Sequence, residues 1–168
     1  ALIVLLIVSL LLTQIPLFNY LGYEFSAVIV SFWSLIAGLL TISMWNKRGS
    51  PANEGFGAFA ARSLMTVVLA LIIPLFVMVV NAFFVRNCSF PHGIMLFFLV
   101  TVLGIVFVHA LSLFCTVVFP SWKKSSFTII WIVVLAQIPY VGLTGPQIFA
   151  FNPVLGFFPG LTYDETLD

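Results

Sequence analysis

Five long apolar segments, separated by short polar loops, dominate this chain. They cover residues 1–18, 25–45, 63–85, 94–119 and 127–143. An α-helix rises about 1.5 Å per residue, so about 20 apolar residues cross the hydrocarbon core of a bilayer. Within that core only helices and closed barrels satisfy the backbone, and the sequence lacks the alternating strands of about ten residues that a barrel needs. We therefore expect an all-α integral membrane protein, a bundle of about five transmembrane helices.

The composition agrees with a chain that is surrounded by lipid. Hydrophobic residues make up 62% and charged residues 7% of the 168 positions, against about 45–50% and about 25% in soluble domains. The net charge of +1 and the lack of a basic stripe argue against nucleic-acid binding. Two cysteines, Cys88 and Cys115, are too few for a disulfide framework. The lipid bilayer is the first partner that we expect.

The first and fifth segments are the least regular. The first opens without a methionine or a basic leader, which indicates an incomplete start and leaves room for a sixth span. The fifth contains Gln137, Pro139 and Gly142 in its second half. Because proline removes a backbone donor, we expect kinks at Pro74 and Pro139. The transmembrane helical domain is thus predicted over residues 1–143.

The basic residues divide unevenly between the loops, which allows the orientation to be predicted. Those in or beside the second and fourth loops are Lys47, Arg48, Arg62, Lys123 and Lys124. Arg86 alone falls on the opposite side. The positive-inside rule then makes loops 46–62 and 120–126 cytoplasmic and the C-terminus extracytoplasmic, and we expect a bacterial inner membrane. The acids on the outer side are Glu24, Asp164, Glu165 and Asp168.

Four polar side chains within the spans are candidates for an intramembrane polar site. His109 is the ionisable one, and it serves either as a neutral, hydrogen-bonded structural group or as part of a proton relay. Gln14, Asn81 and Gln137 are amides in the first, third and fifth segments. Such amides either join helices by hydrogen bonds or line a polar path.

The last part of the chain, residues 144–168, differs from the spans in its pattern. Prolines at 146, 153 and 159 favour extended or turn geometry, and the stretch shows neither a helical period nor a strand alternation. Its aromatic residues are Phe149, Phe151, Phe157, Phe158 and Tyr163. Irregular backbone is not tolerated in hydrocarbon. We therefore expect an interfacial collar at the extracytoplasmic surface of the membrane. The collar is either a greasy exit segment or a surface for docking a partner.

The sequence carries no signature of catalysis or of a cofactor. Motifs for nucleotide binding, for a hydrolase nucleophile and for a zinc protease are missing. Cys88 and His92 have a spacing found among metal ligands, but two ligands make a poor zinc site. We therefore predict that these residues form no enzyme and hold no cofactor or metal.

Three stretches suggest a resemblance: IPLFNYLGYEF at 15–25, NCSF at 87–90 and PQIFAFNPVLGFFPGLTYDE at 146–165. Together they resemble the membrane region of uncharacterised bacterial polytopic membrane proteins. The resemblance implies that the final motif leads into an extracytoplasmic soluble region, sometimes peptidase-like. It implies no catalytic residue in this chain.

These observations favour a membrane anchor or docking subunit of a larger envelope assembly, with other membrane or extracytoplasmic subunits as partners. One alternative is a permease component for a small or amphipathic solute. A second alternative is the membrane region of a longer protein with a peptidase-like domain after residue 168.

Overall fold

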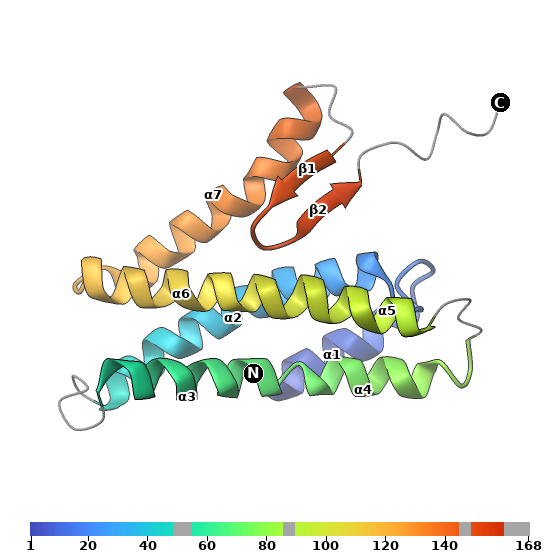
Figure 1. Ribbon diagram of the computed structural model, residues 1–168, viewed down its shortest axis with the longest axis horizontal. Helices are drawn as coiled ribbons and strands as arrows, with labels where there is room; N and C mark the ends of the chain where they lie inside the picture. Colours follow the sequence, from blue (N-terminus) through green and yellow to red (C-terminus); the bar gives the residue numbers. More distant parts are fainter. Residues whose placement is uncertain (49–54, 86–89, 145–148, 160–168) are drawn as a thin grey trace.

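The computed structural model describes residues 1–48, 55–85, 90–144 and 149–159 (Figure 1). In chain order its elements are α1 (Leu2–Leu12), α2 (Tyr23–Arg48), α3 (Phe56–Leu69), α4 (Ile72–Asn81), α5 (Phe90–Phe97), the π-helical turn η1 (Phe98–Val102), α6 (Leu103–Val118), α7 (Lys123–Thr144), β1 (Phe149–Asn152) and β2 (Gly156–Pro159). The expected helical class is thus observed, and the only sheet in the described ranges is one antiparallel β1–β2 pair.

Three helical stretches in the described residues are long and apolar enough to cross a membrane: Tyr23–Lys47, Phe56–Asn81 and Phe90–Val118. They agree with the second, third and fourth predicted spans. Their length and composition are compatible with an integral membrane protein. Three of the five expected spans are therefore found in the described residues, whereas the first and fifth segments differ from the prediction.

The first predicted span ends early. The 11 residues of helix α1 correspond to about 16 Å of rise, whereas the prediction continued the helix to residue 18. Pro16 disfavours helical geometry at Ile15 before it, and Leu17 has a φ of 74°. The chain therefore turns where the apolar composition alone predicted a continuing helix.

The fifth predicted span is helical but is not among the three. Helix α7 begins with Lys123 and Lys124, so its apolar part starts only near Phe127, and it contains Pro139. In Figure 1 its second half diverges from the other helices, and the β1–β2 hairpin lies between it and α6. The hairpin packs on this helix through β1.

Helix α2 occupies the centre of the fold, in contact with α1, α3, α5, α6 and α7. Glycine at position 38 lets α7 approach it, since a Cβ there would lie 2.0 Å from Cζ of the buried Phe127. Trp131 of α7 donates a hydrogen bond from Nε1 to Ser34 Oγ of α2 at 2.8 Å. The first half of α7 is therefore held tightly on the centre of the fold.

Helices α3 and α4 run end to end with a break at Ala70 and Leu71. Leu71 N donates to the Val68 carbonyl instead of the Val67 carbonyl that an α-helix would use. The freed Val67 oxygen accepts a hydrogen bond from Trp33 Nε1 at 2.9 Å. Since Pro74 lacks the donor that would continue the helix, the break agrees with the kink expected there.

Candidate functional site

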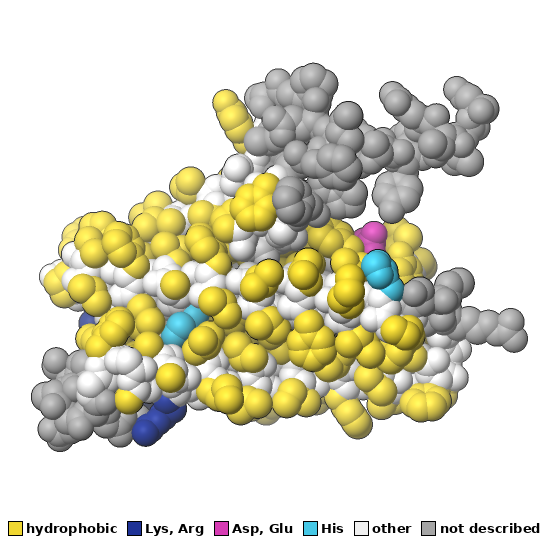
Figure 2. Space-filling model, viewed as in Figure 1, with side chains coloured by type: hydrophobic (Ala, Val, Ile, Leu, Met, Phe, Trp, Pro, Cys, Tyr) yellow, Lys and Arg dark blue, Asp and Glu magenta, His cyan; other side chains and the backbone are white. Residues whose placement is uncertain are grey.

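In the described residues, polar side chains are buried among an apolar core, and many large apolar side chains are exposed. The buried polar residues are Ser9, Ser26, Ser34, Thr41, Ser63, Thr101, His109, Ser112, Thr116 and Asn152. Large apolar side chains such as Phe76, Leu103 and Val133 are more than 60% exposed, and hydrophobic side chains cover most of the face in Figure 2. The core is mainly apolar, as in a water-soluble protein, but so many exposed large apolar side chains are unusual for one.

Most of the buried hydroxyls are bonded to their own helix. Ser9, Thr41, Ser63 and Thr116 each donate to the carbonyl four residues earlier, at 2.7–3.0 Å. In the described part of the chain, every buried side-chain nitrogen or oxygen has a hydrogen-bond partner. Burial of these polar groups therefore costs little free energy. Their hydrogen bonds are used within the protein and are not open to a solute.

His109 joins three helices at the centre of this buried polar set. Its Nε2 lies 3.1 Å from the Ala60 carbonyl of α3 and 3.5 Å from Ser63 Oγ. Its Nδ1 lies 3.3 Å from Thr41 Oγ1 of α2. Because a carbonyl only accepts, we assign the ring hydrogen to Nε2, which makes Nδ1 an acceptor. Nδ1 then competes with the Ala37 carbonyl, which lies 3.0 Å from Thr41 Oγ1, for the one hydrogen of the threonine hydroxyl. This geometry is compatible with a neutral, hydrogen-bonded His109, one of the two roles considered from the sequence.

The three predicted amides do not gather around His109. Gln14 is exposed and donates to Thr13 Oγ1, and Gln137 is also exposed. Asn81 donates to the Asn19 carbonyl, so it ties the end of α4 to the turn after α1. Ala60 and Asn81 are 21 residues apart along α3 and α4, or about 30 Å.

Sequence reasoning missed Thr41 and Ser63, the side chains that face His109. A signal was present in α2, where Ser26, Ser34 and Thr41 follow each other at intervals of eight and seven residues. Intervals of seven or eight return to the same face of a helix. The partner in α3 is a single serine and has no such signal.

The charged residues of the described chain mark two ends. Lys47 near the end of α2, Arg62 in the first half of α3 and Lys123 at the start of α7 lie at one end, which we call the basic end. Glu24, in the first turn of α2, lies at the other, which we call the acidic end. Figure 2 shows Lys and Arg side chains at one end and an acidic side chain at the opposite end.

The aromatic collar was expected to be irregular, and this expectation is wrong for residues 149–159. They form the β1–β2 hairpin, in which Phe151 pairs with Phe157 and Ala150 with Phe158. Gly156 adopts a φ of 71°, and the Asn152 side chain closes the turn. Of the expected docking residues, Phe151 is 57% exposed. Tyr163 and the side chains of Phe149, Phe157 and Phe158 lie outside the described residues.

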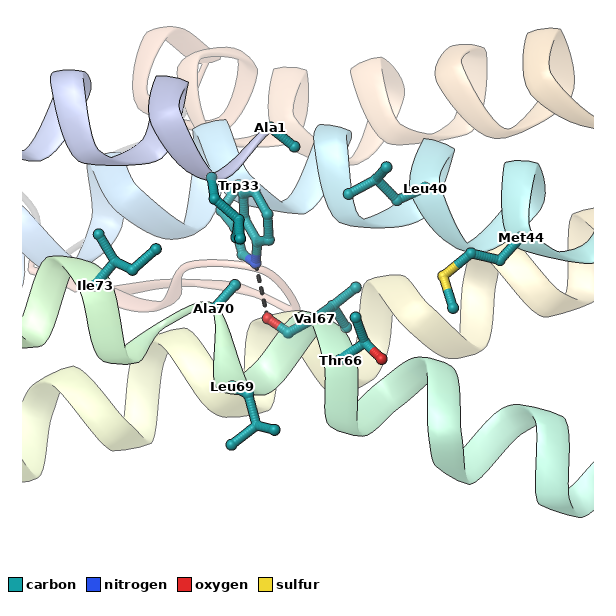
Figure 3. Close-up of a pocket in the computed structure, with 10 residues that line it drawn as sticks. Ala1, Trp33, Leu40, Met44, Thr66, Val67, Leu69, Ala70 and Ile73 are labelled. Carbon is teal, nitrogen blue, oxygen red and sulfur yellow. Dashed lines mark hydrogen bonds between the residues drawn. The ribbon is translucent and has the colours of Figure 1, made fainter.

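A groove of about 400 Å³ lies between the start of α1 and helices α2 and α3. Figure 3 shows Trp33, Leu40 and Met44 on one side and Val67, Leu69 and Ala70 on the other. Its one side-chain hydroxyl, that of Thr66, donates to the Arg62 carbonyl. The groove therefore offers contact to an apolar chain and no reactive group.

Comparison of the chain with protein-family models, with curated proteins and with solved structures finds no match.

Proposed function

We propose that this chain is the membrane-embedded part of an anchor or docking subunit of a larger envelope assembly. One observation carries the proposal: buried side chains include a histidine and many hydroxyls, whereas exposed side chains along the helices are large and apolar. Such a surface is soluble in lipid and not in water. The three long apolar helices supply the length that this location needs.

An anchor accounts for the interior better than a conduit does. The buried hydroxyls are bonded to their own helices, and the one buried histidine is held between fixed partners. The groove beside α1 is apolar. These features favour a rigid helical unit, since a polar path needs side chains that are open to solvent or solute.

The separation of charges supports an orientation with the basic end in the cytoplasm. Single cysteines test it in a background with Cys88→Ser and Cys115→Ser. An impermeant maleimide is expected to label Glu24→Cys in intact cells and to label Lys123→Cys only after lysis. The reverse pattern would contradict the orientation, and labelling of both positions in intact cells would contradict a membrane-spanning arrangement.

We propose that a partner subunit contacts the side chain of Phe151. It is exposed on β1, next to the part of the chain that leads toward the C-terminus. A photo-reactive amino acid at Phe151 is expected to give one discrete protein adduct in native membranes. Phe76 on α4, which is 65% exposed, serves as a matched lipid-facing control. Lipid adducts alone at both positions would contradict a docking role for this surface.

A permease component is the second candidate, and the cluster of Thr41, Ser63 and His109 favours it. Three helices meet at these titratable and hydroxyl groups, as in a proton path. Purified protein in liposomes with a trapped pH dye tests this candidate. A proton flux that is lost in His109→Gln would support a permease, and no flux above that of empty liposomes would dismiss proton conduction.

A further inference from the structure

The β1–β2 hairpin packs against the middle of the span Phe90–Val118 and of α7, and its turn also meets Tyr23, the first residue of α2. A Cβ at residue 104 would lie 2.4 Å from the Val154 carbonyl oxygen in the hairpin turn. Gly104 is 14 residues from each end of the span Phe90–Val118, or about 21 Å. On the other side of the hairpin, Asn152 contacts Val134, 11 residues after the start of α7 at Lys123.

Two residues at the tip of the hairpin are buried, and several polar groups there are hydrogen-bonded. Asn152 is 0% exposed, and Val154 is 1% exposed. The Asn152 Oδ1 accepts from Val154 N at 2.9 Å and from Leu155 N at 3.2 Å. Tyr23 of α2 donates its hydroxyl to the Leu155 carbonyl at 3.2 Å. The Asn152 side chain, both amide groups and the Leu155 carbonyl are thus bonded to protein groups.

A proline in α7 helps to explain where the asparagine binds. Asn152 Nδ2 donates to the Val134 carbonyl at 2.7 Å. Pro139 removes the donor that the next carbonyl, that of Leu135, would have in a regular helix. The Val134 carbonyl, one residue earlier, has a second lone pair that accepts from the asparagine. The asparagine contact therefore lies next to the carbonyl that Pro139 leaves without a helical donor.

Non-helical backbone at membrane depth is tolerated where it is buried in protein, and the hairpin tip meets this condition. We propose that residues 149–159 form a re-entrant hairpin that enters from the acidic end and reaches the middle of the bilayer. It acts as a wedge that holds the second half of α7 away from α6, as Figure 1 shows them. The inference rests on the proposed membrane location but requires neither a docking nor a permease role.

The depth of the hairpin in a bilayer tests the proposal. Phe151→Cys, in the background without Cys88 and Cys115, is labelled with a fluorophore in liposomes that contain nitroxide lipids. The nitroxide is placed either near the headgroup or near the end of the acyl chain. Leu103→Cys, at 61% exposed and near the middle of a span, is the deep reference, and Phe84→Cys, at 83% exposed and just after α4, is the shallow one.

The ratio compares quenching by the acyl-chain nitroxide with quenching by the headgroup nitroxide. We expect this ratio at Phe151→Cys to equal the ratio at Leu103→Cys. A ratio equal to that at Phe84→Cys would place the hairpin at the interface and overturn the proposal, while the membrane location would stand. If no nitroxide lipid quenches Leu103→Cys, the membrane location itself fails.

A second variant tests the close contact between Gly104 and the hairpin turn. Gly104→Val places a side chain against the Val154 carbonyl and should move the quenching ratio of Phe151→Cys toward the shallow reference. Gly57→Val is the control, because an added Cβ there meets nothing within 4 Å. An unchanged ratio in Gly104→Val would show that the close contact at Gly104 does not set the depth of the hairpin.

Discussion

At the scale of single residues, this chain satisfies its buried polar groups locally wherever it can. A serine or threonine hydroxyl that donates to the preceding turn needs no partner from another helix. His109 cannot do this, because its ring nitrogens reach beyond its own helix. It bonds to the Ala60 carbonyl and to Thr41 Oγ1, so it is the buried polar residue whose loss should separate helices.

Replacing His109 with leucine should therefore lower the free energy of unfolding. Two hydrogen bonds are lost at similar side-chain size, and each contributes about 0.5–1.5 kcal/mol net, so we expect a loss of about 1–3 kcal/mol. Unfolding by a denaturing detergent in mixed micelles measures it. Thr128→Val is the control, since the Thr128 hydroxyl is exposed and bonds only to the Lys124 carbonyl. Equal stability of the two variants would contradict the role of His109 in holding α2, α3 and α6 together.

Gly38 provides a second test at the residue scale. Alanine there would place Cβ 2.0 Å from Phe127 Cζ, and overpacking of a buried contact costs about 1–3 kcal/mol. We expect Gly38→Ala to lower the detergent concentration at the unfolding midpoint. Gly57→Ala should leave it unchanged or raise it, because the added methyl group meets no atom and alanine favours the helix by up to about 1 kcal/mol.

At the scale of elements, apolar run length predicted α2, α3–α4 and α5–α6 well. Run length failed where a local feature ends a helix without a change in hydrophobicity. Helix α1 stops before Pro16, although Leu17 and Phe18 continue the apolar pattern. The hairpin was missed because Asn152 and Gly156 form its turn through a side-chain cap and a positive φ, and neither produces a strand alternation.

The α3–α4 break depends on a hydrogen bond from α2, and this dependence can be tested. Trp33→Phe leaves the Val67 carbonyl without its indole donor, which should cost about 1–3 kcal/mol. Pro74→Ala restores a backbone donor and lets the break close, so that Leu71 N can reach the Val67 carbonyl again. In a double-mutant cycle, Trp33→Phe should therefore cost less in the Pro74→Ala background. Additive effects would mean that the proline and the tryptophan act independently.

At the scale of the whole molecule, the candidate site was predicted only in part. His109 was identified from the sequence because it is an ionisable residue within a span. Its partners were not, since contacts between Thr41, Ser63 and His109 depend on how α2, α3 and α6 are rotated against each other. The division into a basic and an acidic end was predictable, because it follows from which loops are on the same side of alternating helices.

The apolar exterior makes one further prediction about the molecule as a whole. Leu103 is 61% exposed and lies one residue from the middle of the span Phe90–Val118. If lipid surrounds it, Leu103→Lys should cost about 2.5–3.5 kcal/mol in membrane insertion. If water surrounds it, an exposed substitution stays within about 0.5 kcal/mol.

Phe84→Lys is the matched control, because Phe84 is 83% exposed but follows the end of α4, where a lysine reaches the headgroups. A glycosylation-reporter insertion assay should therefore show a large loss for Leu103→Lys and a small one for Phe84→Lys. Equal, small effects at both positions would mean that water covers the apolar exterior. The membrane location would then be wrong.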